Sequence, residues 1–293
     1  MFAEVARAKV NLALHITGRR ADGYHDVDTL VAFPEVGDRL VVEPAGEISL
    51  EVDGPFAAAV PTDGANLVLR AARLLAEAVG VPARGARFRL TKALPVASGI
   101  GGGSADAAAA LRLLNRLWGL DLALEALAAL SRPLGADLPI CVLSTPARAT
   151  GIGHDIAPLP ALPNIAFLLV NPGVPVATPD VFRALERRDN APLPAGAAAW
   201  RDARDLAEWL AATRNDLEPA AQRVAPVIGE VVADLAATSG ALLARLSGSG
   251  ATAFALFATA DEAAAAATRL ARTRPSWWIK AADGGATNAA MVA

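Results

Sequence analysis

The segment PVASGIGGGS at residues 95–104 limits what this chain can fold into more than any other part of it. Four of the five positions from Gly99 to Gly103 are glycine, so the backbone can take positive φ angles and expose its N–H groups. A predicted strand at 86–91 precedes the segment. A helix rich in Ala and Leu follows it and directs its positive dipole end toward the glycines. This arrangement is typical of an anion site suited to phosphate groups.

The glycine-rich loop matches neither of two common nucleotide-binding patterns. No Gly-Lys-Ser/Thr ends it, so it is not a Walker A loop, and Ser104 stands where GxGxxG needs its third glycine. A dinucleotide oxidoreductase is further disfavoured because the chain lacks a repeated βαβ pattern. One alternative stays open, namely a purely structural turn in which Ser104 is the helix N-cap and Asp106 a carboxylate of the first turn.

The hydrophobic pattern predicts an α+β chain of two domains. In the first domain we expect strands at 4–16, 38–43, 46–52 and 86–91, helices at 66–79, through Leu111 to Leu117 and at 121–131, and a turn into a buried strand over 134–143. In the second we expect strands at 165–170 and 277–281 and helices near 200–212, 217–224, 227–238 and 261–272. Strand, turn, strand, helix and strand at the end indicate a split βαβ unit. The Pro- and Gly-rich stretch 145–163 predicts a boundary, with domains 1–150 and 151–293.

Charge and composition narrow the classes of partner. The net charge is −3 with no cluster of Lys and Arg, which argues against a nucleic-acid-binding face and against a membrane-surface patch. The single cysteine, Cys141, excludes a disulfide framework and a cysteine metal cluster. We therefore expect a cytoplasmic protein that acts on a small soluble molecule. Only three of the 27 basic residues are lysines (Lys9, Lys92 and Lys280). At each position the lysine results either from neutral drift or from a need for a compact ammonium group that arginine does not offer.

Three motifs in order resemble those of the GHMP kinases (galacto-, homoserine, mevalonate and phosphomevalonate kinases). They are AKVNLAL at 8–14, the glycine-rich loop, and LSGSGATAFAL at 246–256, which together span nearly the whole chain. The resemblance implies the two-domain GHMP kinase fold, with an N-terminal ATP-binding domain and a C-terminal domain of split βαβ type. It also implies ATP and Mg²⁺ as cofactors, with the third motif supporting the loop that binds the triphosphate.

Further segments resemble those members of the family that act on a cytidine diphosphate-linked polyol. These segments are GRRADGYH at 18–25, GADLPICV at 135–142, NPGVPVATPDVF at 171–182 and RNDLEPA at 214–220. The implied function is an ATP-dependent transfer of a phosphoryl group to a hydroxyl of such a substrate.

The resemblance assigns roles to individual residues. It implies that Asp137 is the base that accepts the proton of the acceptor hydroxyl, and that Lys9 contacts the acceptor oxygen and keeps the carboxylate ionised. Asp137 could instead be an Asx-turn residue. The implied ATP-binding residues are Asn66, Pro95, Val96, Ala97, Ser98, Gly99, Ile100, Gly101, Gly102, Gly103, Ser104 and Ala105.

Five more residues are assigned to the substrate by the same resemblance. Asn11 would hydrogen-bond the polyol, Tyr24 and Phe182 would stack on the two faces of the cytosine, and His25 would read its hydrogen-bonding edge. Thr178 lies four residues before Phe182 and shares its helix face. Phe182 could equally be a core aromatic. The Mg²⁺ ligands, the roles of Asp106 and His154, and the oligomeric state stay open.

Two other functions remain as alternatives. Another GHMP kinase would lack an aromatic pair for a nucleobase, so Tyr24 and Phe182 discriminate against it. A non-catalytic nucleotide-binding module would not need Lys9 and Asp137 together, so Asp137→Asn would leave its function unchanged.

Overall fold

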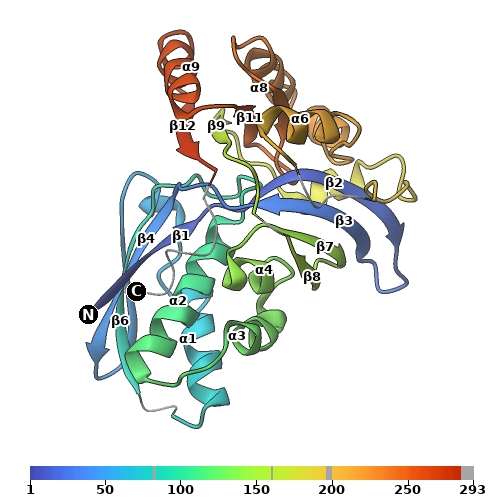
Figure 1. Cartoon of the computed structure of the whole chain (residues 1–293). Coiled ribbons are helices and arrows are strands. Elements are labelled where there is room, and N and C mark those ends of the chain that lie inside the picture. The colour runs from blue at the N-terminus through green and yellow to red at the C-terminus, as the bar shows by residue number, and fades with distance from the viewer. Residues whose placement is uncertain (82–83, 160, 196–199, 285–293) are drawn as a thin grey trace. The chain divides into compact units, whose positions relative to one another are not determined.

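The computed structural model describes residues 1–81, 84–159, 161–195 and 200–284 (Figure 1). Its contacts divide the chain into two compact units, neither of which is continuous in sequence. The first unit consists of Met1–Ala8, Gly37–Val96 and Gly101–Ser144, and the second of Lys9–Val36, Ala97–Ile100 and Thr145–Ala293. The units therefore do not divide at a single point near residue 150, because a stretch close to the N-terminus groups with the C-terminal residues.

The first unit contains a four-stranded sheet in the order β1-β4-β6-β5. Its strands are β1 (Phe2–Arg7), β4 (Gly37–Ala45), β5 (Ile48–Asp53) and β6 (Gly85–Thr91). In β6 the residues alternate, with Phe88 and Leu90 buried and Arg87 and Arg89 exposed. The sheet thus has one apolar face, and the helices over 67–78 and 102–118 pack on the sheet (Figure 1).

The described residues of the first unit form four α-helices. They are α1 (Leu67–Ala78), α2 (Gly102–Trp118), α3 (Leu124–Ser131) and α4 (Leu138–Leu143), accompanied by short 3₁₀ turns at Ala57–Ala59 and Arg132–Leu134. The N-cap of α2 is Gly101 with φ of 64°, so the alternative that made Ser104 the N-cap is wrong.

The strand expected at the end of 134–143 is also wrong, because Leu138–Leu143 is helical. A six-residue apolar run has no period that separates a buried strand from a buried helix. Pro139 in the first turn suits a helix start, where its missing N–H has no intrahelical partner to lose.

One sheet of the second unit contains β2 (Val10–Arg19), β3 (His25–Ala32), β7 (Ala147–Gly151) and β8 (Asp155–Pro158) in that order, all antiparallel. The single strand expected at 4–16 is in fact two strands, β1 and β2, which break at Ala8–Lys9 and pair in different sheets. The expected turn through Asp22-Gly23 joins β2 to β3. The stretch 145–163, expected as a boundary, carries the β7–β8 hairpin.

The other sheet has the order β10-β11-β9-β12. Its strands are β9 (Ala166–Asn171), β10 (Leu243–Leu246), β11 (Ala253–Phe257) and β12 (Trp278–Asp283). Strand β9 lies between β11 and β12 and is antiparallel to both. Helix α9 (Ala260–Thr273) connects β11 to β12, which are therefore parallel to each other. This is the split βαβ unit expected from the sequence.

The remaining helices of the second unit are α5 (Thr178–Arg183), α6 (Ala203–Ala211), α7 (Glu218–Val224) and α8 (Val227–Ala236). Leu14 and Ile16 of β2 share one buried core with Leu168, Val170 and Phe257 of the second sheet. This common core holds β2 in place for the site described next. Within the described part of the chain, no helix combines the length and apolar character needed to cross a membrane.

Candidate active site

The third motif forms a turn between β10 and β11, which we call the serine-glycine turn (residues 247–252). It lies directly against part of the glycine-rich loop. The backbone N–H of Thr252 donates to the carbonyl of Ser98 at 3.0 Å, and the hydroxyl of Ser247 donates to the carbonyl of Gly99 at 3.0 Å. Two of the three motifs that carry the family resemblance therefore meet in the second unit.

Glycine is required where this turn and the loop approach each other. Gly99 has φ of +76°, and a Cβ added there would lie 2.4 Å from the carbonyl oxygen of Ser247 and 2.6 Å from the backbone nitrogen of Gly250. Gly248 has φ of +54°, and its added Cβ would lie 2.9 Å from the carbonyl oxygen of Gly99. The two backbones pack without side chains between them, which suits a site that must bring N–H groups close to a large anion.

The first motif joins the same place through its backbone. The N–H of Lys9 donates to the carbonyl of Ile100 at 2.9 Å, and the N–H of Asn11 donates to the hydroxyl of Ser247 at 3.1 Å. The side-chain amide of Asn11 donates to the hydroxyl of Thr29 at 2.8 Å. Its Oδ1 is buried without a hydrogen-bond partner. An orphaned buried acceptor is rare in folded proteins, and a donor such as a substrate hydroxyl would satisfy it.

A second group of expected residues gathers at α5. Thr178 at its first turn shares a hydrogen bond of 2.8 Å with the hydroxyl of Ser249 in the serine-glycine turn. Phe182, one turn further along, places its ring 4.9 Å from that of His25 between centroids. The side chain of Tyr24 next to His25 is exposed. Helix α5 thus contacts the serine-glycine turn through Thr178 and His25 through Phe182.

The imidazole of His25 has an unpartnered ring nitrogen and a lowered pKa. Its Nε2 is buried and lacks a partner. Burial lowers the pKa of His25, and the positive charges of Arg188 and Arg19 lower it further. The ring is consequently neutral at neutral pH and carries one donor and one acceptor nitrogen.

Ala97, which has φ of 50°, belongs to the second unit with Ser98 and Gly99. Asn66, Gly103 and several further expected residues belong to the first unit. Asn66 is the N-cap of α1, where its Oδ1 accepts from the N–H of Val68 at 2.8 Å and its Nδ2 donates to the carbonyl of Pro61 at 2.6 Å. A Cβ added at Gly103 would contact Leu67, so the starts of α1 and α2 are adjacent. The amide of Asn66 therefore has a capping role, and its contact with ATP stays a prediction.

The catalytic roles of Lys9 and Asp137 also stay predictions. Asp137 stands at the N-cap position of α4 in the first unit, whereas Lys9 directly precedes β2 in the second. Gly101, Gly102, Ser104 and Ala105 cap or open α2, and Pro95 and Val96 lead into the glycines.

Sequence reasoning missed a buried cluster below the start of α2. The ammonium group of Lys92 contacts carboxylate oxygens of Asp38 at 2.5 Å and of Asp106 at 2.7 Å. A Cβ added at Gly102 would lie 3.1 Å from the Nζ of Lys92, so the cluster sits directly beneath the first residue of the helix. The scarcity of lysine was the only signal that pointed to this cluster.

The charged groups of this cluster shift one another's pKa values. Burial lowers the pKa of Lys92, but Asp106 and Asp38 outweigh it, and the net effect raises that pKa. Burial raises the pKa of Asp106 to about 8, with Asp38 adding to the rise and Lys92 opposing it. Asp106 thus forms part of a buried charged cluster with Lys92 and Asp38.

The described residues contain no group of three or more His, Cys, Asp or Glu side chains able to hold a metal ion. Kinase sites hold Mg²⁺ with one or two carboxylates and the phosphates of the nucleotide, so such a group is not required for it. We assign no residue of the chain to Mg²⁺.

Comparison with known families agrees with this geometry. Residues 66–145 match the family described as the GHMP kinases N terminal domain, and residues 183–275 match GHMP kinases C terminal. The chain belongs to the GHMP kinase family and is a kinase.

Within that family, the chain is similar along nearly its whole length to proteins of one name. A 4-diphosphocytidyl-2-C-methyl-D-erythritol kinase of Paramagnetospirillum magneticum is 54% identical over 96% of this chain and 98% of its own. A kinase of the same name from Bradyrhizobium diazoefficiens is 50% identical over 95% and 96%. A crystal structure of 4-(cytidine 5'-diphospho)-2C-methyl-D-erythritol kinase matches with a TM-score of 0.78 and 38% identity, over 97% of this chain and 100% of that one.

Proposed function

We propose that this chain uses ATP to phosphorylate a hydroxyl group of 4-diphosphocytidyl-2-C-methyl-D-erythritol, giving the 2-phosphate, in non-mevalonate isoprenoid precursor biosynthesis. The names of the relatives support this substrate. The observation that carries the proposal is the neutral imidazole of His25, unpartnered at Nε2 and packed on the ring of Phe182. A cytoplasmic location is part of the proposal, and a single cysteine fits that compartment.

The cytidine base would bind at His25 and Phe182. A neutral imidazole can donate to or accept from the polar edge of the base, and an aromatic ring stacks on its face. Tyr24, whose side chain is exposed, is proposed to stack on the other face. Thr178 on the same helix is hydrogen-bonded to the serine-glycine turn, so α5 connects the proposed base-binding residues to the turn that is proposed to support phosphate binding.

ATP would bind through the glycine-rich loop, where Gly99 and its neighbours expose backbone N–H groups, and through the start of α2. Mg²⁺ bound to the phosphates would neutralise part of their charge. Asn66 and the loop residues from Pro95 to Ala105 are the proposed ATP-binding residues.

The transfer itself needs few protein groups. Phosphoryl transfer depends mainly on positioning and on electrostatic stabilisation, so one base and one cation are a sufficient set. We propose that Asp137 accepts the proton of the attacking hydroxyl and that Lys9 stabilises the oxygen that loses it. The unpartnered Oδ1 of Asn11 would accept a hydrogen bond from the polyol.

The test is the release of ADP by the purified protein with Mg²⁺-ATP and 4-diphosphocytidyl-2-C-methyl-D-erythritol. Mevalonate, homoserine and galactose serve as parallel acceptors. Release with the cytidyl substrate alone is expected. Release with another alcohol would keep the family and refute the base-binding group. Binding of ATP without release with any acceptor would favour a non-catalytic module.

A pair of variants separates catalysis from folding. Asp137→Asn removes the proposed base and is expected to lower turnover by about three orders of magnitude while ATP still binds. Asp121→Asn, the same change at an exposed residue of the same unit, is expected to leave turnover unchanged. Full activity of Asp137→Asn would refute the assigned role.

A further inference from the structure

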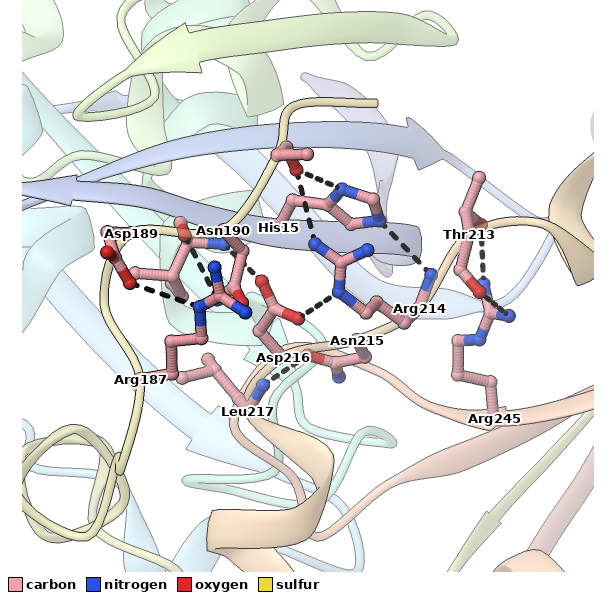
Figure 2. A network of polar contacts seen from close by, with 12 residues as sticks. His15, Arg187, Asp189, Asn190, Thr213, Arg214, Asn215, Asp216, Leu217 and Arg245 are labelled. Carbon is pink, nitrogen blue, oxygen red and sulfur yellow. Dashed lines mark hydrogen bonds and ion pairs between the residues drawn. The ribbon is translucent and has the colours of Figure 1, made fainter. Parts of the chain in front are cut away.

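Residues 213–217 run beside strand β2 and lie at the centre of a network of polar contacts (Figure 2). The N–H of Leu14 donates to the carbonyl of Arg214 at 2.9 Å, and the N–H of Asp216 donates to the carbonyl of Leu14 at 2.8 Å. Asn215 thus stands opposite Leu14 as an isolated parallel bridge. The backbone of Asn215 is fixed to the strand that also carries Asn11.

The side chain of Asp216 strengthens this attachment. Its Oδ2 accepts from the N–H of Ile16 at 2.7 Å, and its Oδ1 accepts from the Nε of Arg214 at 2.5 Å (Figure 2). Asp216 therefore binds strand β2 through Oδ2 and the neighbouring residue Arg214 through Oδ1. Asn215 is left with its side chain free to reach elsewhere.

The side chain of Asn215 reaches the serine-glycine turn. Its Nδ2 donates to the carbonyl of Leu246 at 2.9 Å and to the carbonyl of Gly248 at 2.8 Å. Its Oδ1 accepts from the N–H of Leu217 at 3.0 Å, so the buried amide uses both donor hydrogens and its acceptor. Only a primary amide offers two donors on one neutral planar nitrogen, and an aspartate of the same size offers none.

Strand β10 is attached to β2 by a separate contact. Arg245 donates from Nη1 to the carbonyl of Leu12 at 2.9 Å and from Nη2 to the carbonyl of Thr213 at 2.9 Å. These bonds hold the strand before the turn, whereas the bond from Asn215 to Gly248 holds the turn itself. Gly248 is also the residue that packs against Gly99 of the loop.

We propose that Asn215 is a positioning residue that fixes the serine-glycine turn, and through it the phosphate-binding part of the glycine-rich loop, relative to strand β2. The proposal rests on the proposed ATP-dependent function and adds a residue to it. Asn215 acts through Gly248 and Gly99 rather than by touching a substrate. Loss of its two donor hydrogens would release Gly248 and let the turn shift away from Gly99, which weakens the hold on the triphosphate more than the hold on the cytidine.

The experiment compares two isosteric Asn→Asp changes beside the same strand. Asn215→Asp removes both donors and sets a carboxylate against two carbonyls. Asn190→Asp is the matched control, since the amide of Asn190 donates to the carbonyl of Ile16 at 3.2 Å and its contacts lie on β2. For each chain we would measure the dissociation constants of a non-hydrolysable ATP analogue and of CMP, the thermal midpoint, and kcat and KM.

We expect Asn215→Asp to weaken binding of the ATP analogue by about ten-fold. Its kcat/KM for ATP should fall by about 100-fold, the size of loss that a 1 Å misplacement causes. Its affinity for CMP should stay within about two-fold of the natural chain, as should both affinities of Asn190→Asp. If Asn215→Asp does not fold, Asn215→Ala replaces it, because alanine removes the two donors without adding charge. The same affinities for the ATP analogue and for CMP are then compared.

Unchanged affinity for the ATP analogue in Asn215→Asp or Asn215→Ala would overturn the proposal. So would an equal loss for both ligands together with a lower thermal midpoint, because that pattern indicates only a structural role. If the natural chain binds the analogue but phosphorylates none of the alcohols, the proposed function fails. The comparison of ATP affinities would still decide the role of Asn215.

Discussion

The ring of Phe182 lies 4.9 Å from the ring of His25 between centroids, and the two planes are inclined by 33°. The contact joins α5 to the first residue of β3, two elements far apart in sequence. Helix α5 is also hydrogen-bonded to the serine-glycine turn through Thr178. The aromatic pair and the turn are therefore connected, and each ligand must be measured alone to separate a change at one from a change at the other.

Replacing Phe182 by leucine keeps an apolar side chain and removes the aromatic face. Stacking of a base on an aromatic ring contributes about 1–3 kcal/mol, so Phe182→Leu should weaken CMP binding by roughly ten-fold or more. The KM for ATP should not change. Calorimetric titration with CMP checks this, and Phe56→Leu in the first unit is the control. Normal CMP affinity in Phe182→Leu would place the base elsewhere.

Alanine should be harmful at Gly99 but not at a glycine outside the loop. Gly99→Ala forces a Cβ within 2.4 Å of the carbonyl oxygen of Ser247 at a residue with φ of +76°, so the loop and turn must separate. We expect affinity for an ATP analogue to fall by about ten-fold or more. Gly46→Ala, between β4 and β5 of the first unit, places its Cβ where no atom lies within 4 Å and serves as the control with normal affinity. Equal behaviour of the two variants would contradict the close packing at Gly99.

The buried cluster at α2 should tolerate loss of a carboxylate better than loss of its cation. Lys92→Met leaves Asp38 and Asp106 buried together without a positive charge, which should lower the free energy of unfolding by about 3 kcal/mol or more. Asp106→Asn keeps the contact between Lys92 and Asp38 and substitutes a neutral group for one that already favours its protonated form. It should cost less than about 1 kcal/mol. Urea unfolding at pH 7 measures both, and similar losses would argue against the charge balance described above.

His15 should make stability depend on pH below neutrality. Burial lowers its pKa, Arg214 also lowers it, and the hydrogen bond to Ala191 and the charge of Asp216 oppose them with a smaller effect. Nδ1 donates to the carbonyl of Ala191 at 2.9 Å and Nε2 accepts from the N–H of Arg214 at 3.2 Å, which requires the neutral ring (Figure 2).

With the folded-state pKa below the unfolded value, the unfolded chain takes up the proton first as the pH falls. The free energy of unfolding should therefore decline below pH 6.5, by at most about 1.4 kcal/mol per pH unit for this one group. The decline continues until the pH reaches the lowered pKa. His15→Gln should show a shallower decline from pH 7 to 5.5 in urea titrations, since all other titrating groups are common to both chains. Identical slopes would exclude His15 as a cause.

Local patterns predicted much of the fold. The alternation in β6 and the order of elements after residue 240 were enough for a strand and a split βαβ unit, because both depend on short periods and nearby turns. The break at Ala8–Lys9 was not predictable in this way, since the alternation of apolar and polar residues continues through it and only the pairing of β1 with β4 and of β2 with β3 separates the strands. The grouping of residues 9–36 with the C-terminal half depends on the same distant pairing.

The site was predictable where it depends on glycines and on residues within a motif. His25 and Phe182 are far apart in sequence, and the family resemblance led to them. Asn215 lies in the segment 214–220 that resembles the family, but its role could not be predicted from sequence, because its side-chain donors bind backbone carbonyls and any residue type supplies a backbone carbonyl. Lys92 was noticed for its rarity, but nothing in the sequence indicated that Asp38 and Asp106 would both contact it.

The hydrogen bond from Asn11 to Ser247 spans 236 positions of the chain. At about 5–20 residues per second, a ribosome takes roughly 10–50 seconds to travel that distance. Strand β2 can pair with β3 almost as soon as it emerges, but the turn that completes its surroundings is among the last segments made. The nascent chain therefore cannot hold ATP through this turn during most of its synthesis, and a chain released early would carry the glycine-rich loop without the turn that supports it.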